Sequence, residues 1–228
     1  SDRDVVGISI GTRPDCITDD ILSLIDGYTK KYHVWIEYGL QSIHDKTLRR
    51  INRGHDSRIF LDAVQRTKNT CINICVHVIL GLPGETEDEM LETAEAVASL
   101  GIQGIKLHHL YVAKNTALAE EYFQGKVQTL DMNTYIKLAV GFLERIPSDV
   151  TVQRLVGDTH GNFLLSPVWK ASKAEITDGI TQEFERRGAY QGLRYTSSVS
   201  VTKHAISCPS KTMEGQETEA LGFHTINI

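Results

Sequence analysis

The sequence predicts an α/β fold in which about five parallel β-strands form a curved or closed sheet with helices outside it. The first observation behind this prediction is that β-rich segments alternate five times with amphipathic helical segments. The second is that each strand is followed by a crossover long enough for a helix, and right-handed crossovers place helices on the outer side of a parallel sheet. The predicted strands cover residues 5–11, 34–41, 72–80, 104–112 and 150–156.

The second strand, residues 34–41, has two unlike faces. One face is aliphatic and aromatic, as expected of a core strand. The other face carries Glu37, Gly39 and Gln41. A packed interior holds an acid and an amide only where they contact a ligand or each other, so this face is a candidate site.

The third strand, residues 72–80, is aliphatic on one face and carries His77 on the other. A glycine-rich turn at residues 81–84 follows it. Thr86 and Glu89 then form a capping box that opens an amphipathic helix. This strand, turn and helix define one βα unit of the predicted sheet.

The later units follow the same plan. In the fourth strand Lys106 and His108 share one face, where a lysine is costly to bury without an anionic partner, and His109 points to the other face. The fifth strand contains Arg154. The remaining predicted helices begin after a weak capping box of Ser42 and Asp45, at Ser57, at Asp131 and at about Trp169, and the last two end at Ile146 and Arg187.

The overall composition is that of one globular domain followed by a polar tail. The chain has 228 residues, of which 41% are hydrophobic and 23% charged, and its net charge of −5 does not indicate a broad electrostatic grip on nucleic acid. No apolar run reaches membrane-spanning length and no signal peptide pattern is seen, so we expect no membrane partner and a cytoplasmic location. We assign residues 1–194 to the barrel and residues 195–228, which show no sustained helical or strand period, to the tail.

Polar residues gather where the predicted strands end, which is where parallel α/β sheets bind ligands. Each of them also has a structural interpretation. Arg13 could form a local ion pair with Asp15, Arg53 could be a cation at a helix C-terminus, and His77 could be a hydrogen-bonded core histidine. A phosphate at the glycine-rich turn is disfavoured by the two acids that follow the turn.

Four motifs, taken in this order and spacing, resemble one family: GTRPD at 11–15, EYGLQS at 37–42, NRGH at 52–55 and GLPGET at 81–86. The chain is similar to the radical S-adenosylmethionine (SAM) superfamily, and within it to the YhcC-like proteins, which are related to elongator-type tRNA enzymes and oxygen-independent coproporphyrinogen oxidases. The resemblance implies a partial TIM-type (β/α) barrel, SAM and a [4Fe–4S] cluster as cofactors, and a 5′-deoxyadenosyl radical that abstracts hydrogen from a substrate.

The resemblance also implies roles for individual residues. Gln41 matches a position that contacts the ribose of SAM, and Arg53 matches an arginine that pairs with the methionine carboxylate, in keeping with amide and guanidinium chemistry. No catalytic residue and no metal ligand is assigned. The complete set of expected SAM contacts is Glu37, Gln41, Arg53, His77 and Gly81, and the substrate candidates are Arg13, Lys106, His108, Arg154 and Asp158.

The family's cluster-binding cysteine loop is expected upstream of the first motif. The cysteines Cys16, Cys71, Cys75 and Cys208 lack the compact spacing of cluster ligands, and Cys71 and Cys75 are expected to be small buried hydrophobes. We therefore expect a barrel that lacks its first two strands and the cluster and is inactive as an isolated chain. Its first strand would expose an edge, which a homo-oligomer or the tail could cover.

Three functional hypotheses follow. The first is a radical SAM Fe–S oxidoreductase domain whose substrate is unknown, since relatives act on tRNA, porphyrin precursors and other molecules. The second is a non-catalytic barrel domain that mediates oligomerisation or partner binding. The third is a metal-free barrel enzyme that binds a phosphorylated metabolite near Gly84.

Overall fold

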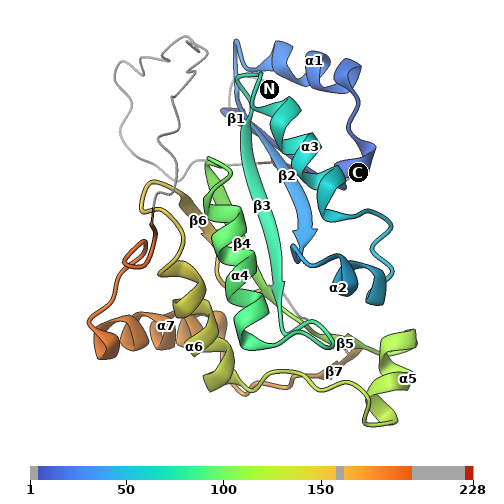
Figure 1. Ribbon diagram of the computed structural model, residues 1–228, viewed down its shortest axis with the longest axis vertical. Helices are drawn as coiled ribbons and strands as arrows, with labels where there is room; N and C mark the ends of the chain where they lie inside the picture. Colours follow the sequence, from blue (N-terminus) through green and yellow to red (C-terminus); the bar gives the residue numbers. More distant parts are fainter. Residues whose placement is uncertain (1–4, 158–161, 197–223, 228) are drawn as a thin grey trace.

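The computed structural model describes residues 5–157, 162–196 and 224–227 (Figure 1). Its main feature is a parallel sheet with the strand order β6-β4-β3-β2-β1-β8. Five of these strands are the predicted ones, so the predicted α/β class and the five-stranded parallel sheet are confirmed. The strands are β1 (Gly7–Thr12), β2 (His33–Gln41), β3 (Asn73–Leu80), β4 (Gly104–His109), β6 (Thr151–Arg154) and β8 (His224–Asn227).

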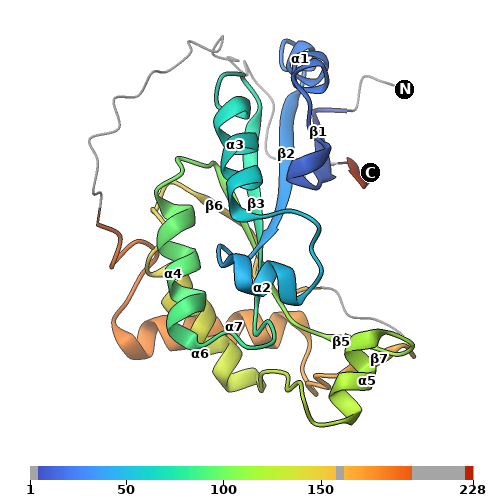
Figure 2. The same cartoon turned by 45° about the vertical axis from the view of Figure 1, so that its right-hand side comes forward.

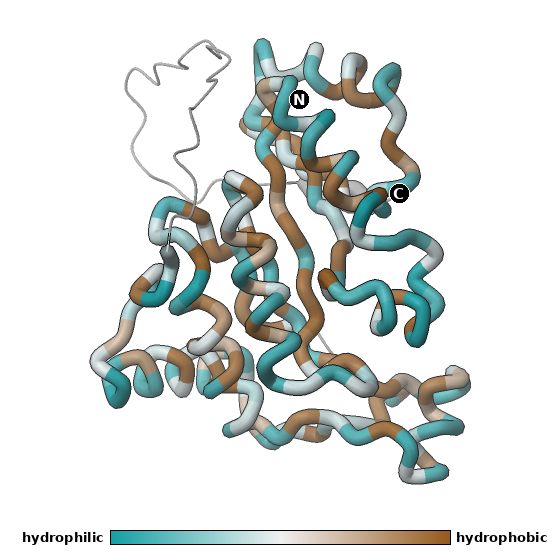
Figure 3. Tube along the Cα trace, viewed as in Figure 1, coloured by the Kyte–Doolittle hydropathy of each residue, from teal (hydrophilic) through white to brown (hydrophobic). Residues whose placement is uncertain are grey.

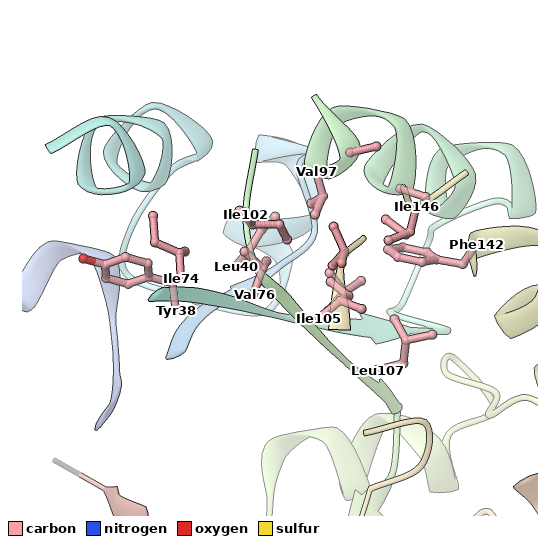
Figure 4. Packing of buried hydrophobic residues seen from close by; sticks show 14 of the residues in the cluster. Tyr38, Leu40, Ile74, Val76, Val97, Ile102, Ile105, Leu107, Phe142 and Ile146 are labelled. Atoms are coloured by element: carbon pink, nitrogen blue, oxygen red, sulfur yellow. The ribbon is translucent and has the colours of Figure 1, made fainter. Parts of the chain in front are cut away.

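Helices pack on one face of this sheet and form the core with it. The buried cluster joins alternate residues of the strands, such as Tyr38 and Ile105, to Val97 and Phe142 on the helices (Figure 4). Apolar segments accordingly run along the strands, and polar segments lie on the outer sides of the helices (Figure 3). The helices are α1 (Asp19–Tyr28), α2 (Asp45–Arg50), α3 (Ser57–Thr67), α4 (Glu87–Ala98), α5 (Ala117–Phe123), α6 (Met132–Leu143) and α7 (Lys173–Arg187), with a 3-10 turn at Pro14–Cys16.

Two of the predicted helix starts need correction. The capping box of Thr86 opens α4 as predicted. However, α2 has His44 at its N-cap without a side-chain bond, because the Asp45 carboxylate accepts from the backbone N–H of Ser57 instead. Helix α7 starts later than predicted, because Ser172 forms a capping box there.

The predicted strand 104–112 is in fact two strands. β4 ends at His109, and β5 (Val112–Ala113) pairs antiparallel with β7 (Leu164–Ser166) in a separate two-stranded sheet. Figures 1 and 2 show β5, β7 and α5 together beyond the carboxyl ends of the main strands. A small apolar cluster of Leu82, Leu110 and Val127 lies in this region. A two-residue strand has no period from which it could be predicted.

The tail contributes a strand that was not predicted. β8 pairs in parallel with β1, from Ile8 opposite His224 to Gly11 opposite Asn227. The tail therefore covers the edge of β1, which is one of the two expected ways to cover it, the other being a homo-oligomer. Among the described residues, no helix is both long and apolar enough to cross a bilayer.

The cysteine expectation holds for one of the two residues. Cys75 is buried and free, and burial raises the pKa of its thiol to about 12, so it behaves as a small hydrophobe. Cys71 is only partly buried and takes part in a disulfide, so the interpretation as a buried thiol was wrong there.

Candidate functional site

The candidate residues form a row across four strands. Gly39, His77, Lys106 and Arg154 are successive partners in the register of β2, β3, β4 and β6. Side chains alternate along a strand, so this row lies on the face opposite the helix-covered core, which we call the inner face. A register shift next to Lys106 brings Arg154 into the row, because a bulge changes the direction in which later side chains point.

Glu37 on β2 is the centre of a buried hydrogen-bond network. Its Oε1 accepts from Ser9 Oγ and from Lys106 Nζ, each at 2.5 Å, and its Oε2 accepts from His77 Nε2 at 2.8 Å. Only 4% of its surface is exposed. Burial alone would raise the pKa of Glu37, but the hydrogen bonds from His77, Lys106 and Ser9 outweigh it and lower the pKa to about 2. Glu37 is thus the anionic partner that Lys106 was predicted to need.

The network is electrically neutral. Burial lowers the pKa of His77, and the nearby charges of Arg154 and Lys106 lower it further against the opposite effect of Glu37. His77 is therefore a neutral donor, and the ion pair is the one between Glu37 and Lys106. We call Ser9, Glu37, His77 and Lys106 the Glu37 network.

The guanidinium of Arg53 contacts β2 at Gly39. Its Nη2 and Nε donate to the Gly39 carbonyl oxygen at 2.8 and 3.3 Å, and His55 Nε2 lies 3.2 Å from the same oxygen. The side chain therefore bonds to β2 and not to the carbonyls at the end of α2, which argues against a simple helix-terminal cation. Burial and the charge of Arg13 lower the pKa of Arg53. Within the described part of the chain, Arg53 has no carboxylate partner.

Gly39 and Gln41 are shaped around this guanidinium. A Cβ on Gly39 would lie 2.3 Å from Arg53 Nη2 and 2.7 Å from Gln41 Nε2, so only glycine leaves room for both groups. Gln41 has a φ of 74°, a conformation that residues other than glycine rarely adopt, and the ladder shifts register there. This backbone brings the Gln41 amide beside Arg53.

Arg13 and Gly81 make their contacts outside the Glu37 network. Arg13 forms an ion pair with Asp15, as its structural interpretation predicted. Gly81 has a φ of 87° and its N–H donates to Met90 Sδ, and a Cβ there would meet Leu130 at 2.8 Å, so local packing accounts for this glycine.

The histidines of β4 separate as predicted. His108 lies on the same face as Lys106, and its ring covers Gly157 so closely that a Cβ there would lie 1.9 Å from Cε1. His109 faces the core, where its ring lies 4.3 Å from that of Trp169 and burial lowers its pKa to about 4. Asp158 lies outside the described residues.

Sequence reasoning missed Ser9. Alternation in the first strand places it on the same face as Gly11, which pairs with Glu37, but only the register between β1 and β2 reveals the bond. No set of three or more His, Cys, Asp or Glu side chains that could hold a metal is found among the residues with described positions.

Comparisons with known proteins agree with this geometry. The profile of the radical SAM superfamily matches residues 1–97, and that of the radical SAM C-terminal domain matches residues 102–186. The uncharacterised protein YtqA of Bacillus subtilis is 41% identical over 189 residues, which cover 83% of this chain and 59% of YtqA. Protein YhcC of Escherichia coli is 38% identical over 170 residues, which cover 74% of this chain and 55% of YhcC.

A solved structure shows the same fold. Elp3 of the archaeon Methanocaldococcus infernus, with an N-terminal deletion, superposes with a TM-score of 0.70 at 19% identity, over 82% of this chain and 43% of Elp3. The chain spans 55–59% of the length of YhcC and YtqA. The two profiles together account for most of the sequence, and the chain belongs to the radical SAM superfamily, in the group of YtqA and YhcC.

Proposed function

We propose that this chain forms the SAM-binding part of a radical SAM Fe–S oxidoreductase-type enzyme, which cleaves SAM reductively to begin hydrogen abstraction from a substrate. The observation that carries the proposal is Arg53. Its partly buried guanidinium bonds to a single carbonyl oxygen and has no carboxylate partner among the described residues. A buried charge of this kind is stabilised by an anionic ligand.

We assign Arg53 and Gln41, whose polar groups lie on either side of Gly39, to two polar parts of SAM. A guanidinium can bond a carboxylate through two parallel N–H groups, which suits the methionine end. The Gln41 amide can both donate to and accept from ribose hydroxyls. Gly39 keeps the strand open between them, because any side chain there would fill the space.

The Glu37 network connects β2, which carries Gly39 and Gln41, to the neighbouring strands. Glu37 already accepts three hydrogen bonds within the protein, which leaves little free acceptor capacity for a ligand. We therefore assign Glu37 and His77 chiefly to holding β2 and β3 in place, and Gly81 to the turn that packs under Leu130.

In this superfamily a [4Fe–4S] cluster, when bound, supplies the electron that cleaves SAM. Cys16 is exposed and Cys75 is buried, and the described residues offer no cysteine set that fits such a cluster. No electron-transfer step is assigned to these residues. Their part in the reaction is to bind and orient SAM.

Calorimetric titration tests the proposal with two ligands and three variants. Arg53→Ala should weaken SAM binding by about 1.5–3 kcal/mol, the usual contribution of a hydrogen bond to a charged group. Gly39→Ala should weaken it as well, because the new methyl group displaces the guanidinium. Gly27→Ala is the matched control, since a Cβ at Gly27 has no neighbour within 4 Å.

The second ligand is 5′-methylthioadenosine, which lacks the methionine carboxylate. Its affinity should be the same for the wild type and Arg53→Ala, because it offers the guanidinium no anion. Equal SAM affinities for the wild type and Arg53→Ala would remove Arg53 from the site and refute the proposal.

A further inference from the structure

Arg154 is a second arginine on the inner face whose charge no described residue neutralises. Its Nε is buried and has no hydrogen-bond partner among the residues that the structure describes. Burial raises the pKa of Cys75 and of Tyr135, and the charge of Arg154 opposes the rise in both, so the guanidinium lies close to β3 and to α6. A buried donor without a partner is costly, and a charged one more so.

The backbone of β6 is held in a way that fixes this position. The hydroxyl of Tyr135, on α6, donates to the carbonyl oxygen of Leu155, the residue after Arg154. The register shift in front of Lys106 makes Arg154, and not Gln153, the partner of Lys106. The arginine with the unpartnered Nε is thus part of an ordered strand.

The described charged groups around Arg154 and Lys106 sum to one positive charge. Glu37 and Lys106 cancel each other, and His77 is neutral. Lys106 has donated one of its three N–H groups to Glu37 and can share another, since it lies on the strand beside Arg154. Among the described residues, the residual charge at this end of the row is that of Arg154.

The space beside Gly104, two residues before Lys106 on β4, is filled. A Cβ on Gly104 would meet Trp35 Cζ3 and Gln153 Nε2, each at 2.8 Å, so these two side chains fill the space above that glycine. A ligand therefore reaches Arg154 from the carboxyl ends of the strands, the side on which parallel sheets bind ligands.

We infer that Arg154, assisted by Lys106, binds a carboxylate of the substrate. The inference rests on the proposed function, because the carboxylate belongs to the molecule on which the radical SAM enzyme acts. A guanidinium fork fits a carboxylate in two hydrogen bonds. A singly charged carboxylate balances the single residual charge, whereas a phosphate dianion would add a second negative charge close to Glu37.

Nuclear magnetic resonance of arginine side chains tests this with three small probes of similar size: propionate, propionamide and methyl phosphate. The Arg154 Nε–Hε signal is identified by its loss in Arg154→Lys, which keeps the charge and removes the fork. We expect propionate to shift this signal saturably with a dissociation constant on the order of millimolar, and propionamide to leave it unchanged. Methyl phosphate should bind more weakly than propionate.

The controls separate this inference from the proposed function. Arg53→Ala should leave the propionate response of Arg154 intact, and Arg154→Lys should leave SAM binding intact. No saturable shift with propionate, an equal shift with propionamide, or tighter binding of methyl phosphate would each overturn the inference. Loss of SAM binding by Arg53→Ala would still support the proposed function in all three cases.

Discussion

The Glu37 network makes a prediction about acid stability that can be calculated from its geometry. Glu37→Gln keeps the size and most of the shape of the side chain and removes its charge. The substitution leaves Lys106 as a buried ammonium without an anion, a situation that usually costs about 3–5 kcal/mol.

The pKa of Glu37 gives a second value, for loss of the same negative charge by protonation. It falls from 4.5 to about 2 on folding, a change of about 2.5 units, and each unit corresponds to about 1.4 kcal/mol, which gives about 3 kcal/mol. Because the folded-state pKa is the lower one, this stabilisation is complete above about pH 4.5 and is lost as the pH falls toward 2. The difference between wild type and Glu37→Gln should therefore shrink across that window.

Urea unfolding at a series of pH values measures this difference. Glu121→Gln is the control, because Glu121 also forms an ion pair, with Arg50, but its side chain is 30% exposed, so we expect little or no change in stability. A Glu37→Gln variant whose stability differs from wild type by the same amount at neutral and acidic pH would refute the reasoning. So would a variant as stable as wild type near neutral pH.

Three further predictions concern packing and capping. Phe142→Ala should lower the free energy of unfolding by about 3–5 kcal/mol in urea titrations, because the ring is fully buried against the sheet. Thr86→Ala should cost about 1 kcal/mol in the same assay, since the hydroxyl accepts the N–H of Glu89 at 3.2 Å. Gly157→Ala should displace the His108 ring, which a Cβ would meet at 1.9 Å, and the imidazole signals of His108 report the movement. An unchanged spectrum would contradict that contact.

Local patterns in the sequence were enough to find the faces of the strands. The alternation in residues 34–41 placed Glu37 and Gln41 on the inner face, and the cost of burying Lys106 predicted an anionic partner without naming it. The structure identifies this partner as Glu37 through the register of three strands. Register depends on contacts between distant segments, so a single strand does not reveal it.

The features that the sequence did not predict depend on contacts between segments that are distant in the chain. The left-handed conformation of Gln41 is unusual for a glutamine, and it exists because the surrounding site holds it. The expected capping role of Asp45 failed because the backbone of Ser57, brought close by the fold, competes for its carboxylate. β8 spans only four residues, too few to show a period, and it gains its stability from pairing with β1.

Arg53 and Arg154, which have no carboxylate partner among the described residues, define the two binding positions that we propose on the inner face. Arg53 bonds to Gly39 at one end of the row, and Arg154 lies at the other end, with the neutral Glu37 network between them. The row crosses three strand spacings, or about 14 Å, which is enough to place a cosubstrate and a substrate side by side. Sites this far apart without a shared partner usually contribute additively, because neither change alters the contacts of the other. The double variant Arg53→Ala/Arg154→Lys should therefore lose SAM binding and propionate binding to the same extents as the single variants, and a larger combined loss would mean that the Glu37 network transmits strain between the two positions.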